Sequence, residues 1–301
     1  MHCSRLGSEA CSHYGASGRS RHRAAELVIM PAWLGDNVEA WAWHIAVVGF
    51  LCCALWETFA PARQQNEAPI ARWVNHFALY GVSIILVTLL VPSERAASWL
   101  GGTGYGPLAL VHAYAGDGVI VAVGILALDF YIYVLHRLEH AVQVLWRLHV
   151  VHHSDIAVDA STSLRHHPLE SLVNNGTGNL LFALLGLPLW AFACYGALSG
   201  LVGLLQHANV RLPPSLESLL NLVIVGPSLH RAHHSSDPMF HNNNFGIVFT
   251  FWDRLFGTYR RPGTMEQDRL AFGVREVSNS GRTGAAWAWI LPLVLRSQPK
   301  S

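Results

Sequence analysis

The sequence predicts an all-α integral membrane protein, with about four transmembrane helices and a helical layer outside the membrane. Three observations lead to this prediction. Of the 301 residues, 51% are hydrophobic and only 13% are charged, and a soluble domain typically has roughly 25% charged residues. So few charges cannot cover a globule of this size with polar surface, and the hydrophobicity also excludes a disordered chain. Finally, the apolar residues gather in long uncharged runs that alternate with polar, histidine-rich stretches.

The charges and the cysteines exclude further classes of protein. The basic residues are 19 arginines and Lys300, spread without a basic block, and the net charge is +1. Nucleic acid is therefore not expected as a partner. The five cysteines include no C-x-x-C pair and have no regular spacing. The sequence thus indicates neither a disulfide scaffold nor a cysteine zinc site.

Three apolar runs are candidates for membrane-spanning helices. Residues 40–56 and 73–92 carry no charged side chain, and each run is close to the roughly 20 residues that a helix needs to cross a bilayer. Residues 107–135 form a third candidate, which Asp117 and Asp129 interrupt.

A fourth apolar run, residues 180–206, is uncharged but contains Pro188. A proline at this position predicts either two short helices that form a shallow hairpin or one kinked span. Residues 285–295 are too few to span a bilayer and are predicted to lie at the membrane surface. The polar stretches 136–175 and 207–282 are predicted to assemble into one layer outside the membrane.

The chain divides into four segments. Residues 1–29 are polar, lack a signal-peptide core and precede Met30, which predicts a disordered or non-native extension with Met30 as the natural start. Residues 30–117 hold the N-terminal transmembrane helices, residues 118–260 form the histidine-rich domain, and residues 261–301 are a cytoplasmic or interfacial tail.

The arginines predict the orientation of the chain in the membrane. Loop 93–106 carries one arginine and one glutamate, whereas the tail after the last histidine group carries Arg254, Arg260, Arg261, Arg269, Arg275 and Arg282. An excess of arginine marks the cytoplasmic side of a membrane protein. The histidine-rich segments are therefore predicted to face the cytoplasm, and only the arginines within residues 1–29 disagree.

Histidine is unusually frequent, and 12 of the 18 histidines lie between His136 and His241. Three groups have helical spacing: His136 and His140 in HRLEH, His149, His152 and His153 in LHVVHH, and His230, His233 and His234 in LHRAHH. Positions i, i+3 and i+4 share one face of a helix, so each group can direct its rings toward one point. Between the second and third groups lie His166, His167 and His207.

These groups predict a metal site. Neutral imidazole binds iron, zinc, copper and nickel, and eight histidines exceed the four ligands of one tetrahedral zinc but suffice for two metals with open positions. A membrane zinc-dependent hydrolase would need a carboxylate base, as in H-E-x-x-H, and that motif is absent. Such a hydrolase, and a degenerate membrane protein that binds metal without catalysis, remain the alternatives. The carboxylates predicted to hold imidazole N–H groups are Asp129, Glu139, Asp155, Asp159 and Asp237.

Longer motifs surround these histidines: DFYIYVLHRLEH, LWRLHVVHHSD, DASTSLRHHPLE, QHANV, LHRAHH and NNNFGIVFTFWDRLFGTY. Over residues 118–259 they resemble the fatty acid hydroxylase superfamily, also called the sterol desaturase family. The resemblance implies a non-haem di-iron centre on the cytoplasmic side of a four-helix membrane domain, and no catalytic residue beyond that centre. The ligands it implies are His136, His140, His149, His152, His153, His230, His233 and His234, with His207 and His167 as possible additional ligands. His166 and His241 are not expected to be ligands.

The resemblance also implies an activity. Members of this superfamily use O₂ and electrons from a redox partner to hydroxylate or desaturate a lipid C–H bond. Because 301 residues leave no room for a fused electron-transfer domain, a separate donor of the ferredoxin or cytochrome b5 type is expected. The excess of arginine over lysine favours a bacterial inner-membrane protein. Fatty acyl chains, sterols, carotenoids, sphingoid bases and ether lipids all remain as substrates.

Overall fold

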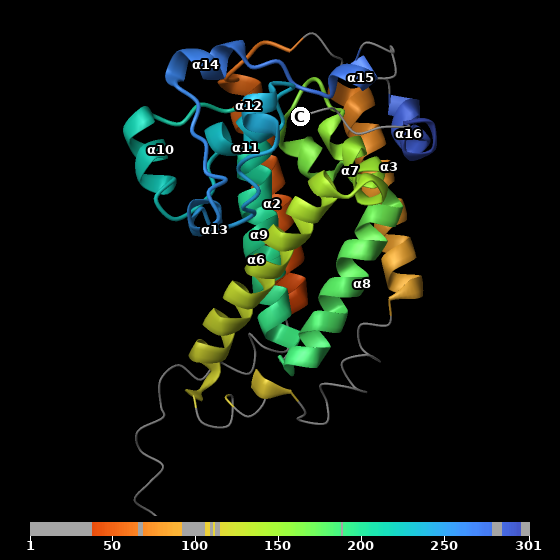
Figure 1. Ribbon diagram of the computed structural model, residues 1–301, viewed down its shortest axis with the longest axis vertical. Coiled ribbons are helices and arrows are strands. Elements are labelled where there is room, and N and C mark those ends of the chain that lie inside the picture. Colours follow the sequence, from red (N-terminus) through yellow and green to blue (C-terminus); the bar gives the residue numbers. More distant parts are fainter. Residues whose placement is uncertain are drawn as a thin grey trace, which may run out of the picture.

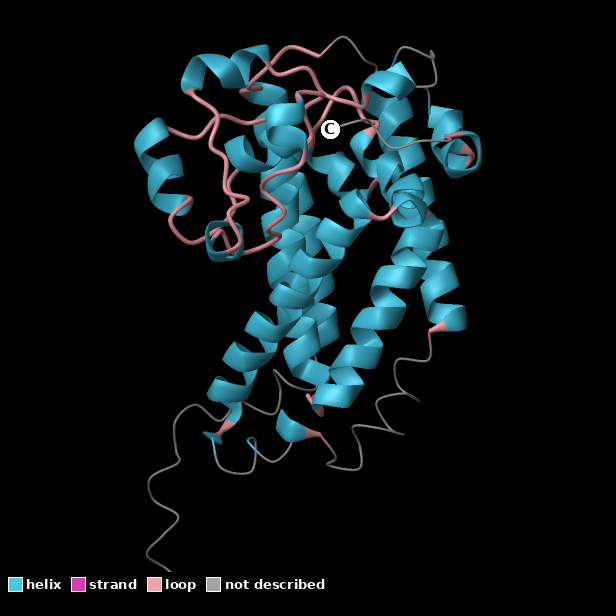
Figure 2. Ribbon diagram, viewed as in Figure 1, coloured by secondary structure: helices cyan, strands magenta, loops and turns pink. Residues whose placement is uncertain are grey.

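The fold is helical throughout the part of the chain that the computed structural model describes, which is residues 38–65, 69–91, 106–108, 111, 115–187, 189–278 and 285–295. Within these residues, extended backbone pairs only in two isolated bridges, Ile224 with Phe249 and Ser235 with Phe272 (Figure 2). The predicted all-α class is therefore confirmed. The predicted extension at residues 1–29 lies outside the described residues.

Three helices are long and apolar enough to cross a membrane: α2 (Val38–Phe59), α3 (Pro69–Leu90) and α6 (Asp117–Ala141). Their outward faces carry apolar side chains that are more than half exposed, such as Val47 on α2 and Leu89 on α3, as expected for helices surrounded by lipid. The first two helices agree with the predicted runs. The third begins at Asp117, later than predicted, because Gly116, with φ 72°, turns the chain just before it.

The fourth apolar run contributes to two helices, α8 (Pro168–Leu185) and α9 (Leu189–His207). Gly186 ends α8 in the left-handed conformation, with φ 70°, so the run is divided between two separate helices rather than forming one kinked span. These helices, of 18 and 19 residues, are longer than the short ones predicted. Neither helix is among the three candidate spans found in the described residues. As Figure 1 shows, α9 lies beside α2 and α6, whereas α8 lies beside α3.

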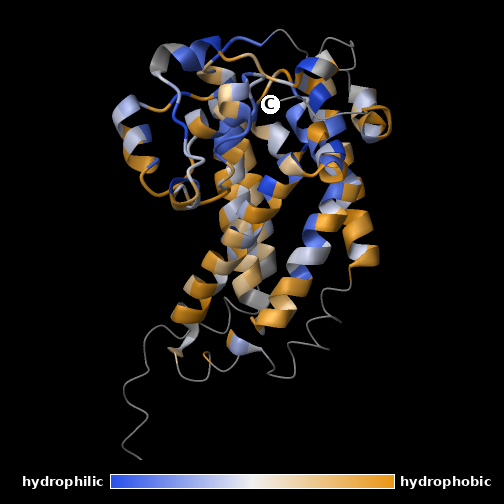
Figure 3. Cartoon of the chain, viewed as in Figure 1, coloured by the Kyte–Doolittle hydropathy of each residue, from blue (hydrophilic) through white to orange (hydrophobic). Residues whose placement is uncertain are grey.

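Short helices form a layer over one end of this bundle (Figure 1). They are α7 (Gln143–His153), η2 (Ala160–Leu164), α10 (Pro214–Leu220), α11 (Pro227–His233), α12 (Pro238–His241), α13 (Phe251–Leu255), α14 (Thr264–Arg269), α15 (Arg275–Ser278), η3 (Ala285–Trp289) and α16 (Leu291–Val294). The layer is predominantly hydrophilic, and the far ends of the long helices are hydrophobic (Figure 3). This division agrees with one polar layer assembled from two stretches of sequence.

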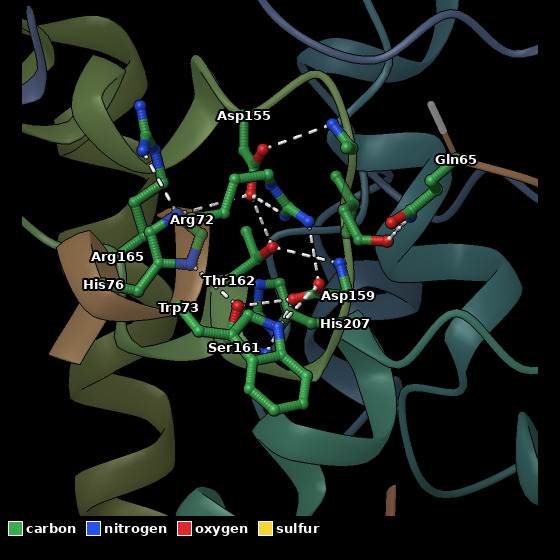
Figure 4. A network of polar contacts seen from close by, with 12 residues as sticks. Gln65, Arg72, Trp73, His76, Asp155, Asp159, Ser161, Thr162, Arg165 and His207 are labelled. Carbon is green, nitrogen blue, oxygen red and sulfur yellow. Dashed lines mark hydrogen bonds and ion pairs between the residues drawn. The ribbon is translucent and has the colours of Figure 1, made fainter. Parts of the chain in front are cut away.

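A buried polar network joins the layer to the bundle. The guanidinium of Arg72, on α3, donates to Asp155 Oδ2 and Asp159 Oδ2 at 2.8 Å each, and Asp155 also accepts from Thr162 Oγ1 at 2.7 Å. Both carboxylates are about 5% exposed. Burial alone would raise the pKa of Asp155, but Arg72 and Arg165 hold it well below its usual range. Figure 4 shows how these side chains converge at the segment that follows α7.

Candidate metal centre

Nine histidines converge in two buried clusters where the bundle meets the layer. In each cluster one nitrogen of every ring lies within 4.8 Å of the corresponding nitrogens of the other rings. The first cluster comprises His136, His140, His149, His153 and His233, and the second comprises His152, His207, His230 and His234. All eight histidines of the three helical groups are therefore brought together, and His207 joins them.

The helices that carry these rings link the two clusters. On α7, His149 and His153 point into the first cluster while His152 points into the second. The group that begins on α11 is divided in the same way, with His233 in the first cluster and His230 and His234 in the second. Residues at i, i+3 and i+4 span part of the helix circumference, so one short helix can reach two adjacent points.

Hydrogen bonds at Nδ1 fix the tautomers of three rings. His136 Nδ1 donates to the Phe245 carbonyl at 2.9 Å, and His233 Nδ1 donates to the Asn243 carbonyl at 2.7 Å. A neutral imidazole that donates at Nδ1 has a bare lone pair at Nε2, yet the Nε2 atoms of His136 and His233 face each other at 3.0 Å. His207 Nδ1 likewise faces the Gly203 carbonyl. Lone pairs that face each other repel unless a cation lies between them, so the donor set fits a metal ion.

The spacing of the nitrogens supports the same conclusion. In the second cluster, His207 Nε2 lies 2.9 Å from His230 Nε2, 3.1 Å from His152 Nε2 and 3.2 Å from His234 Nε2. Metal–imidazole bonds are about 2.0–2.1 Å long, and two such bonds at a right angle separate their nitrogens by about 3 Å. The observed separations are therefore those of neighbouring ligands on one ion.

Burial favours the protonation state that binds metal. Burial, and after it the neighbouring imidazoles, lower the pKa values of five rings outside the candidate membrane spans well below the ordinary value: His152, His153, His230, His233 and His234. These rings are therefore neutral at physiological pH. Neutral imidazole is the form that ligates metals.

Glu170, on α8, is a functional candidate that the sequence interpretation missed. Its Oε1 accepts hydrogen bonds from His149 Nδ1 and His166 Nδ1, both at 2.8 Å. Burial alone would raise the pKa of Glu170, but these two rings hold it below its usual range. The i, i+4 spacing of His166 and Glu170 was the available signal. His166 was not expected to be a ligand; its partly exposed ring stacks on that of His152, with centroids 4.2 Å apart.

The predicted carboxylates lie at different places. Glu139 Oε2 lies 3.5 Å from His149 Nδ1. Asp155 belongs to the Arg72 network, with Asp159. Asp129 binds the 248–252 segment through two backbone N–H groups and the Trp252 indole, and Asp237 caps α12 at the Met239 N–H.

Other histidines of the described residues lie outside the two clusters and have different partners. His167 caps α8 by accepting from the Leu169 N–H. His241 is buried beside the first cluster, with its ring centroid 5.1 Å from that of His140. His76 is fully buried in the Arg72 network, where its Nδ1 lies 2.8 Å from Ser161 Oγ.

A mainly apolar cavity of about 630 Å³ opens onto both clusters. Its walls come from α2, α3, α6, α8 and α9, and the polar end includes His136, His149, His152, His207 and His230. The cavity therefore connects the candidate metal centre with the apolar interior of the bundle.

Removing the Glu170 carboxylate is expected to weaken metal binding without removing a ligand. Glu170→Ala leaves the Nδ1 groups of His149 and His166 without their acceptor, and the loss of such a partner typically costs about 10- to 100-fold in metal affinity. Competition with a chelator measures this change. Glu170→Gln retains one acceptor oxygen and should recover part of the affinity, and Glu266→Gln, at an exposed carboxylate of α14, should leave it unchanged. An unaltered affinity in Glu170→Ala would contradict the role given to this side chain.

The fold and the site together define a class: a helical membrane protein with two histidine clusters at one end of its bundle. Residues 121–258, which hold all nine clustered histidines, match the fatty acid hydroxylase family. Among similar proteins are the ornithine lipid hydroxylase OlsE of Rhizobium tropici, 36% identical over 47% of this chain and 42% of its own length, and human alkylglycerol monooxygenase, 29% identical over 52% and 33%. Human lathosterol oxidase is 26% identical over 68% of this chain and 66% of its own length. No solved structure matches the chain significantly.

The names of the relatives all describe oxidation of a lipid or a sterol, and each match covers part of the relative. By their names they are hydroxylases, monooxygenases, oxidases and desaturases of lipids and sterols. The chain spans less than half the length of the ornithine lipid hydroxylase and of the alkylglycerol monooxygenases that it matches.

Proposed function

We propose that this protein is an O₂-dependent di-iron membrane oxidoreductase that hydroxylates or desaturates a C–H bond of a lipid. The observation that carries this proposal is the placement of two all-histidine clusters at the end of an apolar cavity. A lipid chain in that cavity has its carbons beside the ring nitrogens.

The two clusters are the proposed ligand sets, one for each ion. The eight histidines of the helical groups are the core of this assignment; His207 is added because its Nε2 faces three other rings. His167 is the least favoured of the candidate ligands, because its Nδ1 caps α8. Bound iron supplies the activation of O₂ for attack on an unactivated C–H bond, which side chains alone cannot perform.

The side chains of the protein supply three other requirements. The carbonyls of Phe245, Asn243 and Gly203 orient three of the rings through Nδ1. Burial of both clusters limits the access of water and so limits side reactions. The cavity holds the substrate carbon beside the clusters. Holding the reacting groups together in this way makes their reaction effectively unimolecular.

A separate protein is proposed to deliver the electrons, of the ferredoxin or cytochrome b5 type. Exposed arginines on the layer, Arg254, Arg260 and Arg261, support an acidic donor and also support a cytoplasmic position for the layer. The proposed location is a bacterial inner membrane, with the clusters facing the cytoplasm and residues 118–260 forming the catalytic unit.

Metal stoichiometry and product analysis test the proposal together. Protein expressed with ample iron and purified in detergent without oxygen is expected to contain two irons per chain by elemental analysis. Membranes that contain the protein and a reductase system should accumulate a hydroxylated or desaturated lipid only in the presence of O₂. One zinc per chain without iron would favour the hydrolase, once displacement of iron by zinc during expression is excluded. Two irons without a product would indicate a degenerate member.

A further inference from the structure

Three glycines of α9 line the cavity without any packing requirement for glycine. Gly196, Gly200 and Gly203 are lining residues, and a Cβ atom at any of them would meet nothing within 4 Å. Gly49 shows the opposite situation, since a Cβ there would lie 2.8 Å from Leu201 Cδ1. Glycine weakens a helix interior, so three glycines facing open space indicate that the space itself is needed.

These glycines form a continuous stripe that ends at the candidate metal centre. With His207, they are spaced by four, three and four residues, which places all four on one face of α9. Apolar side chains of α2, Trp43, Val47 and Phe50, also line the cavity. At the histidine end lies the fully buried Glu170, whose Oε2 has no hydrogen-bond partner and which also lines the cavity. The cavity is thus a slot with a flat wall, an apolar wall and a polar end.

The length of the slot matches one lipid chain. Gly196 and His207 are 11 residues apart in one helix, or roughly 16 Å at about 1.5 Å per residue. The hydrocarbon core of a bilayer is about 30 Å thick, so the slot is about as long as one leaflet. The slot is therefore long enough for most of one extended chain of a membrane lipid.

The position of the slot also sets the direction of the chain. Its polar end lies where the bundle meets the hydrophilic layer, and its other end lies at Trp43, within the apolar span Ala40–Phe59. At the Trp43 end the cavity lining is apolar apart from Ser199, whereas Glu139, Glu170 and Asn174 lie at the histidine end. A polar head group therefore finds partners at the histidine end, and burying it without partners at the other end is costly. The head group therefore stays at the layer, and the chain carbons closest to it lie beside the histidines.

Building on the proposed function, we propose that Gly196, Gly200 and Gly203 form the wall of a binding subsite for one hydrocarbon chain of a membrane lipid. The methyl end of the chain lies at Gly196, and oxidation takes place on carbons close to the head group. A side chain at any of the three glycines blocks the part of the subsite between that glycine and the Trp43 end.

Native mass spectrometry of the metal-loaded, detergent-purified protein tests this subsite. The probes are saturated fatty acids from lauric to stearic acid. Gly200→Leu is expected to weaken stearate binding by about tenfold or more, the effect of losing roughly two buried methylene groups, and to weaken laurate binding less. Gly196→Leu should affect only the longest acids, and Gly203→Leu should affect all of them. Gly81→Leu is the matched control, because a Cβ at this α3 glycine also meets nothing within 4 Å and Gly81 does not line the cavity.

The outcomes separate this inference from the proposed function. Each variant should keep the iron content of the wild type, which verifies its fold. Equal binding of all acids by wild type and the three α9 variants would overturn the subsite, even if the wild type oxidises lipid. Length-dependent loss of binding would support the subsite, even if no oxidised lipid forms. Tandem mass spectrometry of a wild-type product should place the new hydroxyl or double bond near the head group, and oxidation near the methyl end would overturn the proposed direction.

Discussion

Replacing His233 with alanine is expected to abolish lipid oxidation and to lower the iron content from two per chain to one or fewer. His233 Nε2 lies 3.0 Å from His136 Nε2, and Nδ1 is held by the Asn243 carbonyl at 2.7 Å. The ring therefore presents a fixed lone pair to the first cluster, and alanine removes it without changing the backbone of α11. Elemental analysis and lipid mass spectrometry measure the two effects.

The matched control for this variant is His44→Ala. His44 lies on α2 at an exposed position and bonds only locally, to the Ala40 carbonyl, so its removal should change neither iron content nor activity. The corresponding change in the second cluster, His152→Ala, should resemble His233→Ala, and both variants should insert into the membrane normally. Two irons and full activity in either of them would refute the assignment of that residue as a ligand.

The second large effect is expected on stability rather than on chemistry. Arg72→Ala removes the cation that lies between Asp155 and Asp159, each 2.8 Å from the guanidinium. The two buried carboxylates then lose the cation that bridges them, and Arg165 remains as the charge near Asp155. Breaking a buried ion pair in this way typically costs about 3–5 kcal/mol. The thermal unfolding midpoint of the purified protein should therefore fall strongly.

An exposed ion pair of the same type provides the comparison. Arg211 pairs with Asp268, and both side chains are 51% exposed. Exposed pairs contribute roughly 0–1 kcal/mol, so Arg211→Ala should shift the unfolding midpoint only slightly. If Arg72→Ala and Arg211→Ala unfold at the same temperature, the Arg72 network does not hold the layer to the bundle.

Much of the fold was predictable because membrane helices and helical metal sites leave periodic signals. The uncharged runs at 40–56 and 73–92 predicted α2 and α3, and the i, i+3, i+4 spacing predicted that the histidines of each group share one region of a helix. Pro188 left two arrangements open. The structure resolves them through Gly186, whose left-handed backbone ends α8.

The division of the histidines into two clusters was not predictable from the sequence. The spacing of His149, His152 and His153 suggests one common target, and only the positions of α6, α9 and α11 around α7 decide which ring points to which cluster. Glu170 was missed for a similar reason, because its partner His149 lies 21 residues away. The placement of Asp129, which binds a segment more than 100 residues downstream, also depends on tertiary packing.

The way α7 and α11 each contribute to both clusters has a consequence for assembly of the centre. When an ion fixes His149 and His153, it also fixes the rotation of α7 and therefore the direction of His152. The same holds for His233 and its neighbours at the end of α11. In the proposed two-metal centre, a second ion would bind rings whose freedom has already been lost, so its binding would cost less conformational entropy. Metal loading of this protein should therefore be cooperative, with chains that hold a single ion scarce at every stage of a titration.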